Sequence, residues 1–120
     1  MKKVLIIEDD EFMEGLEARK MIADGFDVIS AQTGEDAIKK IMEPDLSLIL
    51  LDLELPNYNG FDILKKIKET EKTNKIPVII FSNMGTEENR NKAKEMGASK
   101  FFVKSSLSLT ELIGEINSLI

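Results

Sequence analysis

Four groups of polar residues directly follow short apolar runs in this 120-residue chain. The first apolar run ends in Glu8-Asp9-Asp10, the third in Asp52, the fourth in Ser82-Asn83 and the fifth in Lys104. Carboxylate oxygens are the ligands that Mg²⁺ prefers. A lysine ammonium can hold a phosphoryl oxygen as a point charge, and a hydroxyl can donate a hydrogen bond to another. These residue types suit phosphoryl transfer assisted by a divalent cation.

The chemistry depends on whether these side chains meet. If Glu8, Asp9 and Asp52 lie within a few ångströms, they repel one another and raise one another's pKa values, and a hard dication relieves that repulsion. Mg²⁺ keeps several waters, so one or two direct carboxylates are enough to hold it. An aspartate flanked by a cation, by Lys104 and by the Ser82 hydroxyl can attack a phosphoryl donor, because the charge on the transferred group is neutralised from several sides.

Each residue also has a purely structural interpretation. A carboxylate directly after a strand is often a helix N-cap, which fits Asp9 or Asp10. Asp52 and Ser82 could cap turns, and Lys104 could be a solvated surface side chain. Taken singly, each residue favours the structural interpretation. Their occurrence at the ends of four of five apolar runs favours the chemical one.

The apolar runs predict a repeated strand-helix unit. Three of them are unbroken or nearly so, as strands buried on both faces of a parallel sheet are. The second run contains Asp27 and is weaker, which is typical of an edge strand. Right-handed crossovers would bring the polar residues to one edge of such a sheet, at the carboxyl ends of the strands. The five runs are residues 4–7, 26–29, 46–51, 76–81 and 101–103.

The segments between the runs predict five amphipathic helices. The first has an apolar face of Met13, Leu16 and residues 21–22, and Gly25 can end it. The connections are short enough for an α/β fold, and no repeat, linker or low-complexity segment interrupts the pattern. The expected fold is therefore a doubly wound (βα)₅ structure. The other helices are expected to begin at Thr33, before Phe61, at Thr86 (ending at Gly97) and at the capping box of residues 108–111.

Composition excludes several kinds of chemistry. The chain has no cysteine and no histidine, which excludes disulfides, thiolate and imidazole ligands, a Ser-His-Asp triad and a phosphohistidine within the chain. A net charge of −6 argues against a nucleic-acid or membrane surface. The longest apolar runs, such as residues 48–51, are too short to cross a bilayer. The apolar stretch after Met1 stops at Glu8, so we expect no signal peptide and a cytoplasmic location.

With its apolar runs and polar residues in this order, the sequence resembles the receiver domain of bacterial response regulators along essentially its whole length. The matching segments are residues 8–10, the D-x-x-x-P-x-x-x-G of residues 52–60, residues 77–82, residues 97–99, and Lys104. The resemblance implies a flavodoxin-like fold, with five parallel strands in the order 2-1-3-4-5 and helices on both faces. It also implies one receiver domain over residues 1–120, with no output domain in this chain.

The resemblance implies a role for each matching site residue. Asp52 would accept a phosphoryl group from a sensor histidine kinase, a histidine phosphotransfer protein or a small phosphodonor. Asp9 would bind Mg²⁺ or Mn²⁺ directly, Glu8 largely through water, and Glu54 through its backbone carbonyl. Such a protein is no enzyme in the usual sense, because it promotes only its own phosphoryl transfer and autodephosphorylation.

The remaining implied roles concern the switch. Ser82 and Lys104 would hold the phosphoryl group, and Phe101 matches the family's aromatic switch residue, although plain core packing explains Phe101 equally well. Output would pass through the face formed by the fourth helix, fifth strand and fifth helix, to a protein partner or a second copy of the chain. In the loop after Asp52, Gly60 permits a tight helix entry and Tyr58 is expected to be exposed.

The sequence departs from the family pattern after the lysine. Receivers commonly follow the lysine with a proline in a cis peptide bond, whereas Lys104 precedes Ser105. A cis bond before a residue other than proline costs about 2.5–4 kcal/mol, so we expect a trans bond. The stretch to Leu112 is also one residue longer than the usual pattern. The position of Lys104 depends on how this turn is built.

Other functions fit less well. Haloacid-dehalogenase-type phosphatases need a second aspartate where this chain has Glu54, and a cap domain for which there is no room. A pseudoreceiver, an interaction module without phosphorylation, would not need the acidic and basic residues that are all present. Nucleotide binding lacks both a G-x-G-x-x-G and a P-loop motif. The receiver portion of a longer DNA-binding or enzymatic regulator remains an alternative.

Overall fold

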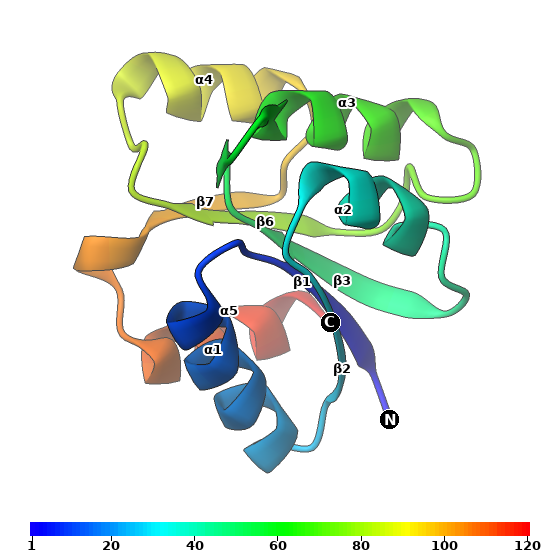
Figure 1. The fold of residues 1–120 in the computed structure, drawn as a ribbon. Helices are drawn as coiled ribbons and strands as arrows, with labels where there is room; N and C mark the ends of the chain where they lie inside the picture. Colours follow the sequence, from blue (N-terminus) through cyan, green and yellow to red (C-terminus); the bar gives the residue numbers. More distant parts are fainter.

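A five-stranded parallel sheet forms the centre of the computed structural model, which describes all residues 1–120 (Figure 1). The strand order is β2-β1-β3-β6-β7, which is the order 2-1-3-4-5 when the five sheet strands are counted along the chain. The predicted α/β fold and its strand order are therefore confirmed. The strands are β1 (Lys3–Ile7), β2 (Asp27–Ala31), β3 (Leu46–Leu51), β6 (Val78–Ser82) and β7 (Lys100–Val103).

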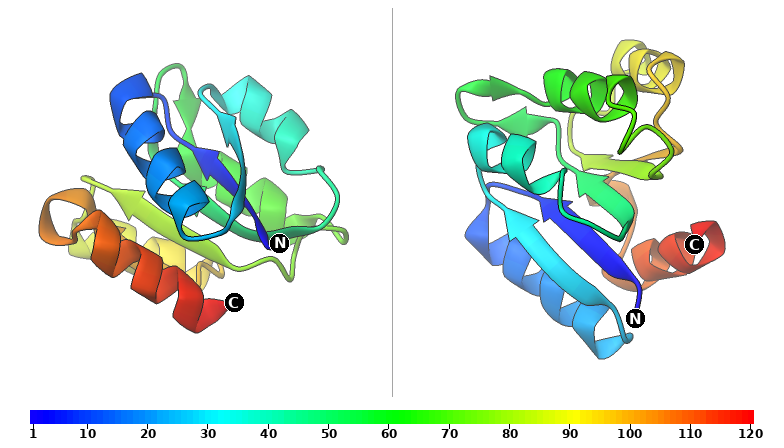
Figure 2. Two further views of the ribbon diagram at one scale, coloured as in Figure 1. Left: turned by 90° about the horizontal axis from the view of Figure 1, so that it is seen from below. Right: turned by 90° about the vertical axis from the view of Figure 1, so that its right-hand side faces the viewer.

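Five helices cover the two faces of this sheet (Figure 2). Buried side chains of α2, α3 and α4 share one apolar cluster with the sheet, and those of α1 and α5 share the other. The structure is thus doubly wound, as the sequence predicts. No helix is both long enough and apolar enough to cross a membrane. The helices are α1 (Glu11–Ala23), α2 (Gly34–Lys40), α3 (Gly60–Glu69), α4 (Glu87–Glu95) and α5 (Leu109–Leu119).

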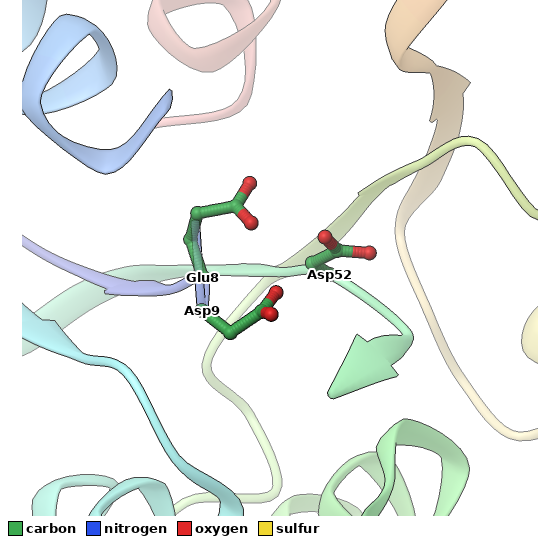
Figure 3. Close-up of side chains that lie close together, drawn as sticks. All are labelled: Glu8, Asp9 and Asp52. Atoms are coloured by element: carbon green, nitrogen blue, oxygen red, sulfur yellow. The ribbon is translucent and has the colours of Figure 1, made fainter. Parts of the chain in front are cut away.

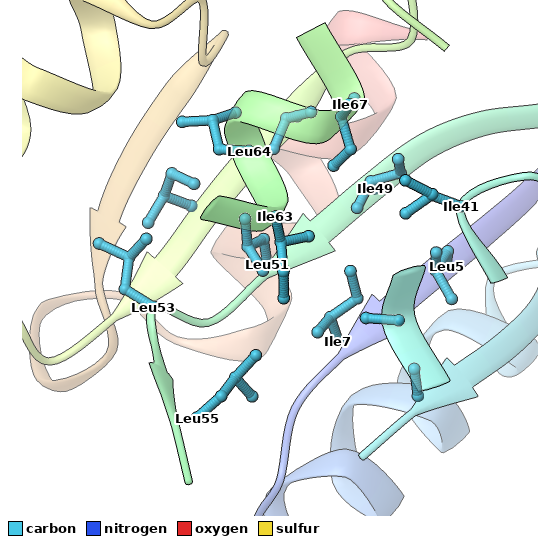
Figure 4. Packing of buried hydrophobic residues seen from close by; sticks show 14 of the residues in the cluster. Leu5, Ile7, Ile41, Ile49, Leu51, Leu53, Leu55, Ile63, Leu64 and Ile67 are labelled. Carbon is cyan, nitrogen blue, oxygen red and sulfur yellow. The ribbon is translucent and has the colours of Figure 1, made fainter. Parts of the chain in front are cut away.

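The inner strands have unbroken apolar runs because their side chains point alternately to the two covered faces of the sheet. In β1, Leu5 and Ile7 face the cluster under α2, α3 and α4 (Figure 4), whereas Val4 and Ile6 face α1 and α5. Successive side chains of a strand point to opposite faces, so a strand covered on both sides must be apolar at every position. The edge strand β2 begins with the exposed Asp27, which confirms the weaker edge strand.

Side-chain caps begin the helices where the sequence predicts them. Oδ1 of Asp10 accepts hydrogen bonds from the backbone N–H groups of Phe12 and Met13, which makes Asp10 the N-cap of α1. Ser108 and Glu111 form the predicted reciprocal capping box at α5. Each cap satisfies backbone donors that a helix start leaves without partners.

The predicted buried face of α1 is wrong at one position. Ile22 is 58% exposed, whereas Glu17 is 2% exposed and faces inward. Met13, Glu17 and Met21 are spaced four residues apart, so they lie on one side of the helix. Met21 is fully buried and Met13 packs against the same apolar cluster. The helix therefore buries a carboxyl group on its apolar side.

A short hairpin after β3 is absent from the sequence prediction. Strands β4 (Glu54–Leu55) and β5 (Tyr58–Asn59) pair antiparallel. Tyr58 is half-buried rather than exposed, because it packs against the start of α2: a Cβ atom added to Gly34 would lie 2.1 Å from its Cγ. A Cβ atom at Gly60 would lie 2.5 Å from Cα of Leu53, which confirms the need for glycine at this helix entry.

Candidate functional site

Three carboxylates converge at the carboxyl edge of the sheet. Glu8 and Asp9 directly follow β1, Asp52 directly follows β3, and these strands are neighbours. One carboxylate oxygen from each of the three lies within 4.8 Å of the others, and the three side chains lie close together (Figure 3). Glu8 is 2% and Asp52 5% exposed, while Asp9 lies at the surface. The sequence-predicted acidic residues are therefore brought together.

Lys104 lies in this cluster, although no proline follows it. It begins η1 (Lys104–Ser106), a short 3₁₀ turn after β7, and every peptide bond of the chain is trans, including that to Ser105. Its Nζ donates a hydrogen bond to Oδ2 of Asp52 at 2.8 Å and another to Oε1 of Glu8. A trans peptide bond and a 3₁₀ turn thus place the ammonium beside both buried carboxylates.

Ser82 is the last residue of β6 and is fully buried. The backbone N–H of Met84 donates to its Oγ at 3.2 Å, so the hydroxyl also stabilises the turn after the strand. The proton of this hydroxyl stays free to be donated elsewhere. Since β6 lies next to β3, Ser82 and Asp52 occupy the same edge of the sheet.

Glu54 and Phe101 lie at the periphery of the site. The backbone N–H of Glu54 donates to Oδ1 of Asp52 at 3.0 Å, and its side chain is exposed. Phe101 is half-buried in β7 and packs against the apolar cluster under α4. The guanidinium of Arg90 lies 5.6 Å from the centre of its ring. Phe101 therefore packs in the core, as its structural interpretation predicts, and its role as a switch residue stays a prediction.

The buried charges do not balance. Burial raises the pKa of Glu8 to about 7. The hydrogen bond from Lys104 lowers this pKa, and the negative charge of Asp52 raises it. Burial alone would lower the pKa of Lys104, but its hydrogen bonds to Asp52 and Glu8 hold that pKa well above its ordinary value. One permanent cation therefore faces three carboxylates, and this excess of negative charge attracts a dication.

The donor set suits Mg²⁺ or Mn²⁺. Both ions take oxygen ligands, and two oxygens bound to one octahedral Mg²⁺ lie about 3–4 Å apart. One oxygen from each of Glu8, Asp9 and Asp52 lies within 4.8 Å of the others, which is close to that spacing. Lys104 already occupies one oxygen of Glu8. Asp9, which is exposed, is left as the most accessible direct ligand.

A comparison of the whole sequence with known protein families identifies the family of this chain. A sequence model described as the response regulator receiver domain matches residues 4–117. The chain belongs to this family. The receiver is 32% identical over 120 residues to the transcriptional regulatory protein CpxR of Escherichia coli (strain K12), covering 100% of the receiver and 50% of CpxR. It is also 32% identical over 117 residues to the gliding motility regulatory protein of Myxococcus xanthus, covering 98% of the receiver and 15% of that protein. The receiver thus spans half or less of these relatives.

Solved structures agree with the receiver fold. The receiver domain of the Francisella response regulator 1452 superposes with a TM-score of 0.89 at 28% identity, covering 99% of this receiver and 96% of that chain. The Vibrio cholerae chemotaxis protein CheY4 superposes with a TM-score of 0.91 at 21% identity, covering 100% and 99% of the two chains. At that lower identity the likeness supports the fold alone.

Sequence reasoning missed one residue near the site. Glu17 is buried on α1, and the charges of Glu8, Lys104 and Asp52 all act on it. The signal was present in its spacing, four residues after Met13 and four before Met21, which places it on the apolar side of the helix.

Proposed function

We propose that this receiver is a phosphoacceptor switch of two-component signal transduction, phosphorylated on Asp52. The observation that carries the proposal is the position of the Asp52 carboxylate. One oxygen bonds Lys104 and the other bonds the Glu54 N–H, with Asp9 and Glu8 alongside. This arrangement holds a nucleophilic carboxylate where the charge of an incoming phosphoryl group can be neutralised.

In the proposed reaction an oxygen of Asp52 attacks the phosphorus of a phosphodonor. A new P–O bond forms as the bond from phosphorus to the donor's nitrogen or oxygen breaks, and the leaving group takes that electron pair. Lys104 holds one phosphoryl oxygen and the Ser82 hydroxyl donates to another. Later attack by water breaks the P–O bond to Asp52 and returns the free carboxylate with inorganic phosphate.

The receiver would hold Mg²⁺ or Mn²⁺ with carboxylate oxygens of Asp9 and Asp52 and the backbone carbonyl of Glu54, and with Glu8 through water. The ion would supply positive charge against the phosphoryl oxygens. This assignment rests on the converging carboxylates and on the single lysine that faces them. Family membership supports it, because the resemblance to receiver domains implies a magnesium site at these residues.

Signal output would follow from the added charge. Phosphorylation adds about −1.5 to −2 charge, which attracts Ser82 and Lys104 and biases a two-state element that includes Phe101. Lys104 would then exchange its hydrogen bond to Glu8 for one to the phosphoryl group. The face formed by α4, β7 and α5 would change its affinity for a protein partner or for a second copy of the chain.

The phosphodonor partner in this proposal is a sensor histidine kinase or a histidine phosphotransfer protein, in the cytoplasm. The acidic net charge favours protein partners over direct nucleic-acid contact. Residues 1–120 would form one receiver domain. A second candidate is the receiver portion of a longer regulator, favoured because this chain matches half of CpxR.

The test separates a phosphoacceptor from a phosphatase. The protein is mixed with Mg²⁺ and either acetyl phosphate or p-nitrophenyl phosphate. A receiver should take one phosphoryl group per chain from acetyl phosphate and lose it slowly, without turnover of the monoester. Repeated hydrolysis of p-nitrophenyl phosphate at a rate that depends on Asp52 would contradict the proposal.

A further inference from the structure

Glu17 is the only residue of the chain with a buried side-chain polar atom that has no hydrogen-bond partner. The atom is Oε1 of its carboxyl group. The side chain is 2% exposed and lies on the inward side of α1 with Met21. Glu14, one turn earlier, is half-buried but accepts a hydrogen bond from the Ser30 hydroxyl at 2.7 Å. Glu17 therefore differs from its neighbour in lacking a hydrogen-bond donor that would stabilise a negative charge.

An unpaired buried carboxyl group avoids its charge by keeping a proton. Burial, and then the negative charge of Glu8, raise the pKa of Glu17 to about 8. The negative charges of Asp52 and Glu14 also raise this pKa, and Lys104 is the one cation that lowers it. Glu17 thus responds to the charge of the acidic cluster without being one of its proposed ligands.

The elements packed against α1 supply no further cation. Helix α1 packs against β2 and α5. The charged residues of these two elements are carboxylates only: Asp27 in β2, and Glu111 and Glu115 in α5. None of these residues can favour a negative charge on Glu17. The cations of α1 itself, Arg19 and Lys20, are exposed. The cation that favours ionisation of Glu17 is Lys104, at the edge of the sheet where a dication would bind.

We propose that Glu17 is a buried proton-binding site coupled to the acidic cluster, holding a proton while the cluster lacks a dication and releasing it when a dication binds. The inference rests on the proposed function, since it needs a dication at Glu8, Asp9 and Asp52. In this exchange the cluster gains one dication, the O–H bond of the Glu17 carboxyl group breaks, and the proton goes to solvent. Because such coupling is reciprocal, ionised Glu17 tightens dication binding by the same factor.

The wild-type protein provides the direct test. Glutamate is labelled with ¹³C, Glu17 is assigned through its backbone, and the shift of its side-chain carboxyl carbon is followed from pH 5 to 10 with and without saturating Mg²⁺. The expected midpoint is about 8 without Mg²⁺. Mg²⁺ should lower it by about one pH unit or more, which corresponds to about tenfold tighter Mg²⁺ binding on the alkaline side.

Two variants complete the test by calorimetry. Glu17→Gln reproduces the shape of the protonated side chain, so Mg²⁺ binding should match wild type at pH 6, fall below it at pH 9, and release fewer protons at pH 7.5. Glu95→Gln, an exposed glutamate on α4 that serves as the matched control, should follow the wild-type pH dependence. The release of protons is measured by repeating the titration in buffers of different ionisation enthalpy.

The contrary outcomes are distinguishable. A Glu17 midpoint that Mg²⁺ leaves unchanged, while the resonances of Asp9 and Asp52 shift, would overturn the coupling and leave the metal site standing. A midpoint below 5 would overturn it as well. If Mg²⁺ moved no resonance at Asp9 or Asp52, the metal site itself would fail, and the proton site with it.

Discussion

Nζ of Lys104 lies 2.8 Å from Oδ2 of Asp52, although 52 residues separate them in the sequence. Asp52 follows β3 and Lys104 follows β7, and the end of β6 lies between those strands in the sheet. The ion pair therefore spans three strand ends and depends on the β3-β6-β7 half of the sheet. It also links the proposed phosphorylation site to the edge strand that carries Phe101.

Lys104→Ala should separate phosphorylation from output. Asp52 and the dication ligands stay in place, so labelling by acetyl phosphate should persist. The side chain proposed to couple the phosphoryl group to β7 is lost, so amide NMR shifts of Phe101 and its neighbours should no longer respond to labelling. Lys65→Ala, an exposed lysine on α3, should respond like wild type. Full response in Lys104→Ala would contradict the proposed role.

Asp9→Asn should weaken Mg²⁺ binding and stabilise the metal-free protein. The exposed Asp9 carboxylate lies within 4.8 Å of those of Glu8 and Asp52, and removing one charge relieves about 1 kcal/mol of repulsion per neighbour in a water-like dielectric. Urea unfolding in the presence of a chelator should show the gain in stability. Calorimetry should show the loss of Mg²⁺ affinity. Asp27→Asn, at the exposed start of β2, should change neither. A less stable Asp9→Asn protein would contradict this account of the cluster.

The stability of the metal-free protein should fall as pH rises from about 4.5 to 8. The pKa of Glu17 rises from 4.5 to about 8 on folding, so over this window the native state holds a proton that the unfolded state has lost. The free energy of unfolding should decrease by about 1 kcal/mol per pH unit from this group, and Glu8 adds to the trend in the lower part of the window.

Glu17→Gln should flatten this pH dependence, because Gln cannot titrate, and should be more stable than wild type at pH 8. Urea unfolding between pH 5 and 8.5 measures both effects. The control Glu95→Gln, at an exposed glutamate on α4, should keep the wild-type slope. The same slope in Glu17→Gln would mean that Glu17 is ionised throughout this range.

Gly34→Ala should destabilise the fold through Tyr58. The added Cβ would lie 2.1 Å from Cγ of Tyr58, so the ring must move, at a cost of about 1–3 kcal/mol. In a Tyr58→Ala background the same substitution should cost less. Gly114→Ala in α5 meets nothing within 4 Å and should stabilise by about 0.5–1 kcal/mol. Equal costs of Gly34→Ala in both backgrounds would exclude the contact with Tyr58 as the cause.

The sequence is most informative where burial on two faces makes a strand wholly apolar. Such strands end visibly at their first polar residue, so the apolar runs alone place Glu8 and Asp52 at one edge of the sheet. Helix starts are equally predictable, because caps such as Asp10 and Ser108 satisfy backbone donors locally. Parallel topology then brings these strand ends together.

Three features were not predicted from the sequence. The β4–β5 hairpin has strands of two residues, too short for any periodicity. Glu17 was missed because a carboxylate is expected on the solvated side of a helix, and its position depends on which side α1 turns to the sheet. The place of Lys104 depends on the η1 turn, whose backbone no residue type in Lys104–Ser106 dictates.

Intact-mass measurement of the protein after incubation with acetyl phosphate tests the central claim most directly. The wild-type protein, with and without Mg²⁺, is compared with Asp52→Asn, with and without Mg²⁺. We predict the mass increase of a single phosphoryl group only in the wild-type protein with Mg²⁺. Full Mg²⁺-dependent labelling of Asp52→Asn, or no labelling of the wild-type protein with Mg²⁺, would contradict the assignment of Asp52 as the phosphoacceptor.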